Sequence, residues 1–191
     1  MSASKRDQLV RKALTVFYNN GFHATGMDKL AKETGVSKTA IYKHFRTKDD
    51  LIQATLRLRD EEFRNWLIRR VEELADTPVG RMLAIFDALD EWFHDKNYSG
   101  CMFIKASSEY LERDHPVLRT SAEHKLLLIR AVEKYAEEAG AQDAPALARS
   151  IILLKEGAIV TAHIISPKGV AAEAKKSAEI LISASVGELV S

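Results

Sequence analysis

The side chains with the clearest chemical potential lie in segment 25–48 of this 191-residue chain. The segment is rich in lysines and hydroxyl groups, which donate hydrogen bonds to phosphate oxygens and to base edges of DNA. We expect Lys38, Thr39 and Lys43 to contact base edges. The small side chain of Ala40 would contact a thymine methyl group. A second set would bind the DNA backbone: Thr25, Ser37, Tyr42, His44 and Lys48.

Two short helices joined by a tight turn would carry these side chains. Thr25 and Asp28 have the spacing of a capping box at the start of the first helix. Gly35 falls where a helix end favours positive φ, and Ser37 can cap the second helix. Ile41 and the phenylalanine four residues later would face inward, which turns the basic side chains outward. A helix-turn-helix of this kind places its second helix in the major groove.

A third helix would begin just after Thr47, which forms a second capping pattern with Asp50. Lys48 stands in the first turn of this helix, where a cation opposes the helix dipole. A bound phosphate would instead be attracted by the dipole and the lysine together. The alternative interpretation, a solvated basic surface helix, explains the charge but not the combination of turn and outward face.

The segment resembles the DNA-binding region of TetR-family transcriptional regulators. The resemblance is carried by an amphipathic helix near Leu9 and by a series of short matches: Gly21-Phe22, Thr25, Leu30-Ala31, Gly35-Val36-Ser37, Tyr42-Lys43-His44-Phe45 and Lys48. In addition, Gly100-Cys101-Met102-Phe103 looks like a segment found in a subgroup of such regulators. The resemblance implies an all-α fold in which a three-helix DNA-binding head is joined by a long helix to a helical ligand-binding and dimerisation body.

The charge distribution agrees with a DNA-binding head. Residues 1–50 hold ten of the 28 Lys and Arg residues but five of the 27 Asp and Glu residues, although the whole chain has a net charge of only +1. Basic charge is therefore concentrated where the motif lies. The single cysteine excludes an intramolecular disulfide and suits the cytoplasm, where we expect the protein to reside. No apolar signal core and no apolar run long enough to cross a bilayer is present.

The hydrophobic periodicity predicts helices nearly throughout, with residues 1–48 as the DNA-binding domain and 49–191 as the ligand-binding and dimerisation domain. Further helices are expected over 48–75, 78–93, 101–111, 116–139, 144–165 and 169–187. The last two are unusually apolar or rich in small residues. We expect them to form a homodimer interface, because a palindromic operator requires two heads. Its predicted residues are Leu147, Ile151, Leu154, Ala158, Ala162, Ala174, Ala178 and Leu181. Packing within one chain is the alternative.

Aromatic residues gather between positions 86 and 110 and suggest a pocket for a small apolar or aromatic effector. The predicted lining residues are Phe86, Trp92, Phe93, Cys101, Phe103, Tyr110 and His163. Ordinary core packing is the alternative for each of them. Cys101 could be an electrophile or redox sensor if an imidazole lies near it, or simply a small buried hydrophobe.

Nothing in the sequence favours an enzyme. There is no phosphate-binding loop and no spacing typical of metal ligands, so we expect neither a cofactor nor a metal. The acidic cluster of Glu109, Glu112 and Asp114 is interpreted as a solvated helix end. The sequence therefore predicts a ligand-responsive transcriptional regulator, most simply a repressor released from a palindromic operator by a small molecule. A helical scaffolding protein and an enzyme that uses the aromatic cavity are the rival hypotheses.

Overall fold

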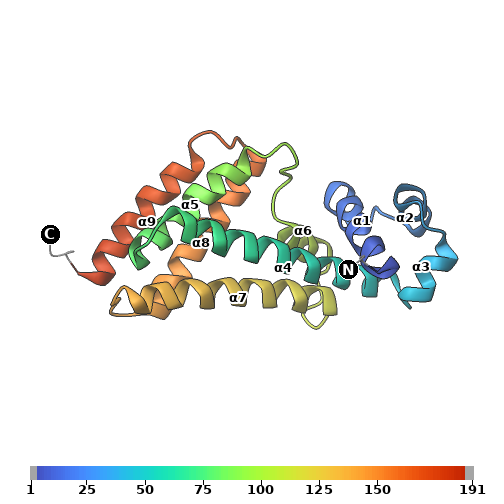
Figure 1. The fold of residues 1–191 in the computed structure, drawn as a ribbon, viewed down its shortest axis with the longest axis horizontal. Coiled ribbons are helices and arrows are strands. Elements are labelled where there is room, and N and C mark those ends of the chain that lie inside the picture. Colours follow the sequence, from blue (N-terminus) through green and yellow to red (C-terminus); the bar gives the residue numbers. More distant parts are fainter. Residues whose placement is uncertain (1–3, 188–191) are drawn as a thin grey trace. The chain divides into compact units, whose positions relative to one another are not determined.

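The computed structural model describes residues 4–187, and this part of the chain contains helices and no strand (Figure 1). The all-α fold predicted from the sequence is confirmed. The nine helices of residues 4–187 are α1 (Lys5–Asn20), α2 (Met27–Thr34), α3 (Lys38–His44), α4 (Lys48–Leu74), α5 (Pro78–Phe93), α6 (Met102–Glu109), α7 (Pro116–Glu138), α8 (Ala144–Ile164) and α9 (Val170–Val186). No helix in this range is long and apolar enough to cross a membrane.

Contacts divide the chain into two compact units. The first, here called the head unit, contains the described residues up to Phe63 together with Cys101–His124. The second, the body unit, contains Arg64–Gly100 and the described residues from Lys125 onward. This division differs from the sequence-based boundary at residue 48, because α4 up to Phe63, α6 and the start of α7 are grouped with the predicted DNA-binding segment. The boundary at 48 stays a prediction.

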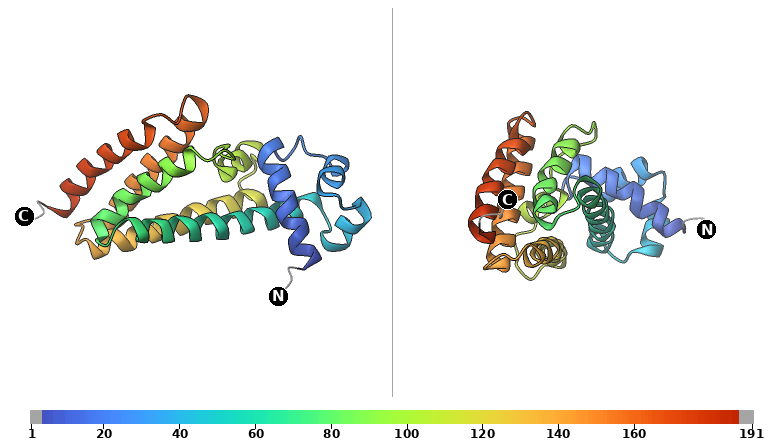
Figure 2. Two further views of the ribbon diagram at one scale, coloured as in Figure 1. Left: turned by 45° about the horizontal axis from the view of Figure 1, so that its top comes forward. Right: turned by 60° about the vertical axis from the view of Figure 1, so that its left-hand side comes forward.

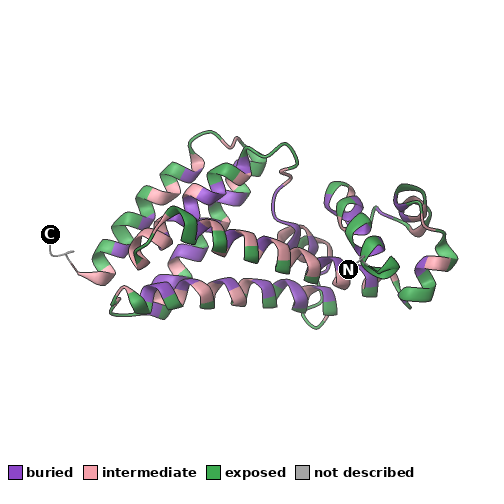
Figure 3. Ribbon diagram, in the orientation of Figure 1, coloured by how far each residue is buried: buried purple, intermediate pink, exposed green. Residues whose placement is uncertain are grey.

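The core of the head unit is built from the inward faces of α1, α2 and α3. Leu9, Phe17 and Leu30 are at most 1% exposed, and Ile41 of α3 is equally buried. The Phe17 ring stacks on Phe22 in the turn after α1, with ring centroids 5.5 Å apart. Figure 3 shows buried residues along one side of α1, with exposed residues on its other side. The period of the apolar residues thus sets which face of each short helix is free for function.

In the body unit, α8 and α9 lie side by side and α5 packs against both (Figures 1 and 2). This packing buries part of the predicted dimer interface within a single chain. Five of its residues are at most 5% exposed within a single chain: Leu147, Ile151, Ala158, Ala162 and Ala178. Leu154 and Ala174 are half-buried, and Leu181 is 37% exposed. Five of the eight residues assigned to a partner therefore pack inside the chain, as the alternative interpretation states for them.

Other apolar side chains of α8 and α9 remain exposed. Leu153 and Ile164 are each 73% exposed, and Val160 is 38% exposed. With Gly157 they follow the spacing that places residues on one face of α8. On α9, Ile180 is 71% exposed. We call the residues Leu153, Gly157, Val160, Ile164, Ile180 and Leu181 the α8–α9 surface.

The body unit also buries a charged cluster. Lys155 is 1% exposed, and its ammonium group donates to Glu156 Oε1 at 2.8 Å. Lys125 donates to Glu156 Oε2 at 2.6 Å. Burial alone would raise the pKa of Glu156, but the two lysines outweigh it and lower the pKa to about 2.

Candidate nucleic-acid interface

The turn between α2 and α3 has the geometry predicted from its residue types. Gly35 ends α2 with φ of 68°, a left-handed conformation that glycine adopts without strain. The Ser37 hydroxyl accepts a hydrogen bond from Ala40 N at 3.2 Å and so caps α3. The predicted second capping pattern is confirmed as well: Thr47 N donates to Asp50 Oδ2 at 3.0 Å, and Asp50 N donates to Thr47 Oγ1 at 3.1 Å.

The two faces of α3 differ sharply in chemistry. Ile41 is 1% exposed and Phe45, just after the helix, is 5% exposed. These two side chains attach α3 to the rest of the head unit. The opposite face is open, with Tyr42 50% exposed. Its other members are exposed or, for Ala40, half-buried: Lys38, Thr39, Ala40, Lys43 and His44. All side chains that we expect to contact base edges are therefore together on one accessible face.

The predicted capping box of Thr25 and Asp28 is not formed at the start of α2. Gly26, not Thr25, is the N-cap of α2, and no side chain caps this helix. Thr25 is fully buried, and its hydroxyl donates to Gly21 O at 2.6 Å. Asp28, the other half of the predicted capping box, instead forms an ion pair with Lys38 at 2.5 Å. The capping prediction for Thr25 is wrong because this hydroxyl is used by the turn that precedes the helix.

Lys48 begins α4 and is half-buried. Its ammonium group lies 3.5 Å from the carbonyl oxygen of His23. Burial lowers the pKa of Lys48, while the carboxylates of Asp49 and Glu109 act in the opposite direction. Lys48 therefore lies near the turn between α1 and α2.

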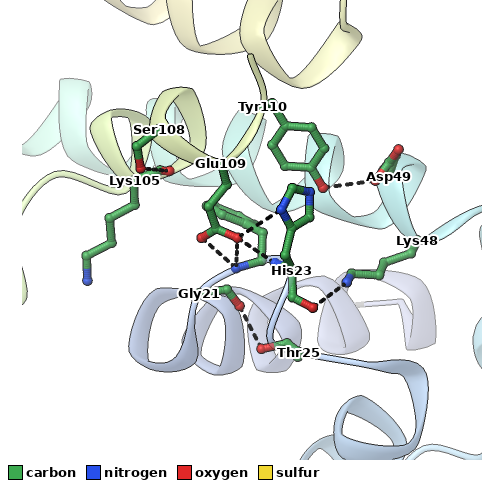
Figure 4. A network of polar contacts seen from close by, with 10 residues as sticks. Gly21, His23, Thr25, Lys48, Asp49, Lys105, Ser108, Glu109 and Tyr110 are labelled. Carbon is green, nitrogen blue, oxygen red and sulfur yellow. Dashed lines mark hydrogen bonds and ion pairs between the residues drawn. The ribbon is translucent and has the colours of Figure 1, made fainter. Parts of the chain in front are cut away.

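A network from α6 reaches this same turn (Figure 4). Both carboxylate oxygens of Glu109 accept from Phe22 N, at 3.0 and 3.1 Å, and Oε2 also accepts from His23 N at 2.5 Å. Tyr110 donates its hydroxyl proton to Asp49 Oδ1 at 3.0 Å. Burial, followed by this hydrogen bond, raises the pKa of Tyr110. The prediction that Glu109 is part of a solvated helix end is therefore wrong. Its carboxylate accepts hydrogen bonds from two backbone N–H groups.

The predicted effector-pocket residues are divided between the two units. In the body unit, Trp92, Phe93 and His163 surround Tyr98, with ring centroids 4.9, 5.2 and 6.1 Å from it, and Phe86 is fully buried. In the head unit, Phe103 stacks on His124 at 3.7 Å, and Tyr110 packs on Phe22 at 6.4 Å. Cys101 is buried at the start of α6, as expected of a packing cysteine.

An apolar hollow lies elsewhere in the body unit. None of the predicted pocket residues lines it. It lies among α4, α5, α7 and α8 and is lined by Leu67, Ile68, Val71, Ile85, Leu128, Ala131, Val132, Tyr135, Ile152 and Lys155. Among residues 4–187, no group of three or more His, Cys, Asp and Glu side chains is arranged to hold a metal ion.

Residues 9–55 match the model of the family described as bacterial regulatory proteins, tetR family. The chain is 30% identical to the transcriptional repressor KstR2 of Mycolicibacterium smegmatis over 46% of this chain and 44% of the relative. It is 46% identical to the transcriptional activator FasR of the same organism over 27% of this chain and 24% of the relative. The chain thus matches less than half the length of either curated relative.

Solved structures extend the similarity to nearly the whole chain. SCO4454, a TetR-family transcriptional regulator from Streptomyces coelicolor, has a TM-score of 0.88 and 26% identity, covering 95% of this chain and 90% of that one. A regulator from Streptomyces avermitilis described as a putative tetr-transcriptional regulator has a TM-score of 0.85 and 27% identity, covering 96% and 98%. The body, which the family model leaves unmatched, therefore shares its fold with these proteins as well.

Proposed function

Because this chain belongs to the TetR family, a non-enzymatic family of transcriptional regulators, we propose that it binds operator DNA through α3 and regulates transcription in the cytoplasm. The carrying observation is the division of α3 into a buried apolar face and an open basic face. Lys38, Thr39 and Lys43 would contact base edges, and Ala40 a thymine methyl group. Ser37, Tyr42, His44 and Lys48 would position the DNA backbone. Thr25 is left out because its side chain is buried.

The ion pair between Lys38 and Asp28 gives this proposal a specific feature. Asp28 is 89% exposed, so the pair is screened by water and easily broken. Lys38 can therefore exchange Asp28 for a guanine edge at small energetic cost. Until it does so, the carboxylate also repels phosphates from this end of α3, which favours sequences that offer Lys38 an acceptor.

Operator recognition is tested by selecting bound sequences from random DNA and then substituting single residues. Lys48→Ala should weaken binding to all sequences alike and flatten the salt dependence, since each neutralised phosphate contributes about −0.9 to the log–log slope. Lys43→Ala should instead change which base is preferred at one position. Lys134→Ala serves as a control, because this lysine is exposed on α7 of the body unit.

Two results would contradict the proposal. If no selected sequence outcompetes random DNA at physiological salt, the chain has kept the fold without operator recognition, as the scaffolding hypothesis holds. If Lys134→Ala changes binding as much as Lys48→Ala, the basic charge acts as a whole and α3 is not the contact surface.

We further propose that the protein is a homodimer joined through the α8–α9 surface. The support is the exposure of Leu153, Val160 and Ile164 along one face of α8, since water contact with large apolar side chains is unfavourable. Gly157 on the same face would let a partner helix approach closely. Two heads held by such an interface fit a palindromic operator.

The proposal includes repression that is relieved by a small apolar or aromatic effector. We assign the effector to the apolar hollow of the body unit, in place of the aromatic set predicted from the sequence. The hollow has a volume of about 20 Å³ and must widen to admit an effector. Its lining includes residues of α4, the helix that also carries Lys48 at its first position. An effector that fits better when α4 is displaced would shift the population toward heads that no longer match the operator.

Effector binding should raise the melting temperature and lower operator affinity together, because the two effects are thermodynamically linked. Ala131→Phe should block the hollow and lower effector affinity by about 10-fold or more, which reduces both effects at a given effector concentration. Operator affinity without effector should stay within about 2-fold of wild type. The measurements are thermal denaturation and operator titration over a range of effector concentrations. Ala172→Phe, on the exposed face of α9, is the control. An effector response that survives Ala131→Phe would place the site elsewhere.

A further inference from the structure

The turn between α1 and α2 depends on a side chain from α6. Gly21 ends α1 with φ of 79°, and the chain turns at Phe22 and His23. Their N–H groups point to the Glu109 carboxylate, which accepts all three hydrogen bonds of this contact (Figure 4). Phe22 is fully buried, so its N–H would lose its partner without this carboxylate. The His23 imidazole adds a weaker contact, with Nδ1 3.7 Å from Glu109 Oε2.

The backbone of His23 also contacts Lys48. His23 N donates to Glu109, and the His23 carbonyl oxygen accepts from Lys48 Nζ. One residue of the turn therefore links a carboxylate on α6 to the lysine that we expect to contact an operator phosphate. Tyr110, the next residue after Glu109, holds Asp49 through its hydroxyl. Glu109 thus holds the turn that faces Lys48, and Tyr110 holds Asp49, the residue that follows Lys48.

We propose that Glu109 is a positioning residue for operator binding. By holding the N–H groups of Phe22 and His23, it fixes the His23 carbonyl and, through it, the ammonium group of Lys48. This inference rests on the proposed operator binding and adds to it a residue outside the helix-turn-helix. Glu109 lies 61 positions after Lys48 in the chain, and both belong to the head unit.

The sign of the effect separates positioning from simple electrostatics. Glu109→Gln removes a negative charge near DNA, and charge alone would then strengthen binding to a polyanion. Positioning predicts the opposite. A neutral amide oxygen is a weaker acceptor for two N–H groups than a carboxylate, so the turn loosens and Lys48 loses its fixed place. We expect operator affinity to fall by about 3- to 10-fold.

A double-mutant cycle between Glu109→Gln and Lys48→Ala tests the link directly. If Glu109 acts through Lys48, the effect of Lys48→Ala should shrink to less than half in the Glu109→Gln background. Glu112→Gln is the matched control: it makes the same charge change three residues along, at an exposed position. Its cycle with Lys48→Ala should be additive. Glu109→Asp, which keeps the charge but shortens the side chain, should also weaken binding and provides a second variant if the amide variant does not fold.

An independent readout needs no DNA. Hydrogen exchange at the Phe22 and His23 amides should accelerate by about 10-fold or more in Glu109→Gln and stay unchanged in Glu112→Gln. Additive effects in the Glu109 and Lys48 cycle, or a gain in operator affinity, would overturn this inference and leave the proposed function intact. If the wild-type protein binds no operator, the proposed function itself fails, whatever the amides show.

Discussion

A single arginine at Leu153 should convert the protein into a monomer and lower operator affinity by at least about 100-fold. Leu153 is 73% exposed in one chain and lies in the middle of α8. In the proposed dimer it would be buried against its partner, where an unpaired guanidinium is strongly unfavourable. The substitution should not disturb folding, because in the isolated chain this side chain faces solvent. A monomer would offer one head to a two-fold operator and lose half of the DNA contacts.

Light scattering at micromolar concentration and titration of the selected operator measure these two effects. Leu126→Arg is the control, since it places the same charge at a 54% exposed leucine on α7, outside the α8–α9 surface. It should leave both mass and affinity unchanged. A dimer that persists in Leu153→Arg would contradict the proposed interface. Ala158→Arg is a contrasting case: Ala158 is 4% exposed inside the chain, so this variant should unfold the body unit.

Glu156→Gln should lower the free energy of unfolding by about 3 kcal/mol at neutral pH. The substitution removes the ionised carboxylate that contacts the ammonium group of Lys155, which is 1% exposed. Lys125 would lose the same partner at the edge of the cluster. Urea denaturation of both proteins at pH 7 measures the difference. Adding Lys155→Met to Glu156→Gln should recover much of the loss, because a buried apolar side chain of similar length needs no counter-ion.

The cluster also predicts a pH dependence with a definite sign. The pKa of Glu156 is lowered from 4.5 to about 2 in the folded protein. Its contribution to stability is therefore fully present above pH 4.5 and is lost progressively as the pH falls toward 2. The difference in stability between wild type and Glu156→Gln should shrink over this range. A difference below about 1 kcal/mol at pH 7, or one that does not change on acidification, would show that the cluster is weakly coupled to folding.

Features of the head that depend on neighbouring residues could be predicted from the sequence. Gly35, Ser37 and the Thr47–Asp50 pair act within a few positions of their own backbone partners, so residue type and spacing determine their roles. The inward turn of Ile41 follows from the helical period alone. Thr25 shows the limit of such rules, because its hydroxyl donates to Gly21 O in the preceding turn and does not cap α2.

The remaining features were decided by tertiary packing. Helix α8 is apolar around most of its circumference, so periodicity shows that it is buried but not which face meets its own chain. The sequence analysis therefore assigned Ile151 and Ala158 to the interface and not Leu153, whereas packing against α5 and α9 buries the first two and leaves Leu153 exposed. The hydrogen-bond partners of Glu109 could not be predicted from the sequence either. Its partners are backbone N–H groups 86 and 87 residues away, and such groups leave no trace in the identity of Phe22 or His23. Sequence thus determined the local geometry of α3, whereas only the folded chain could decide which surfaces stay exposed and which distant carboxylate holds the turn before α2.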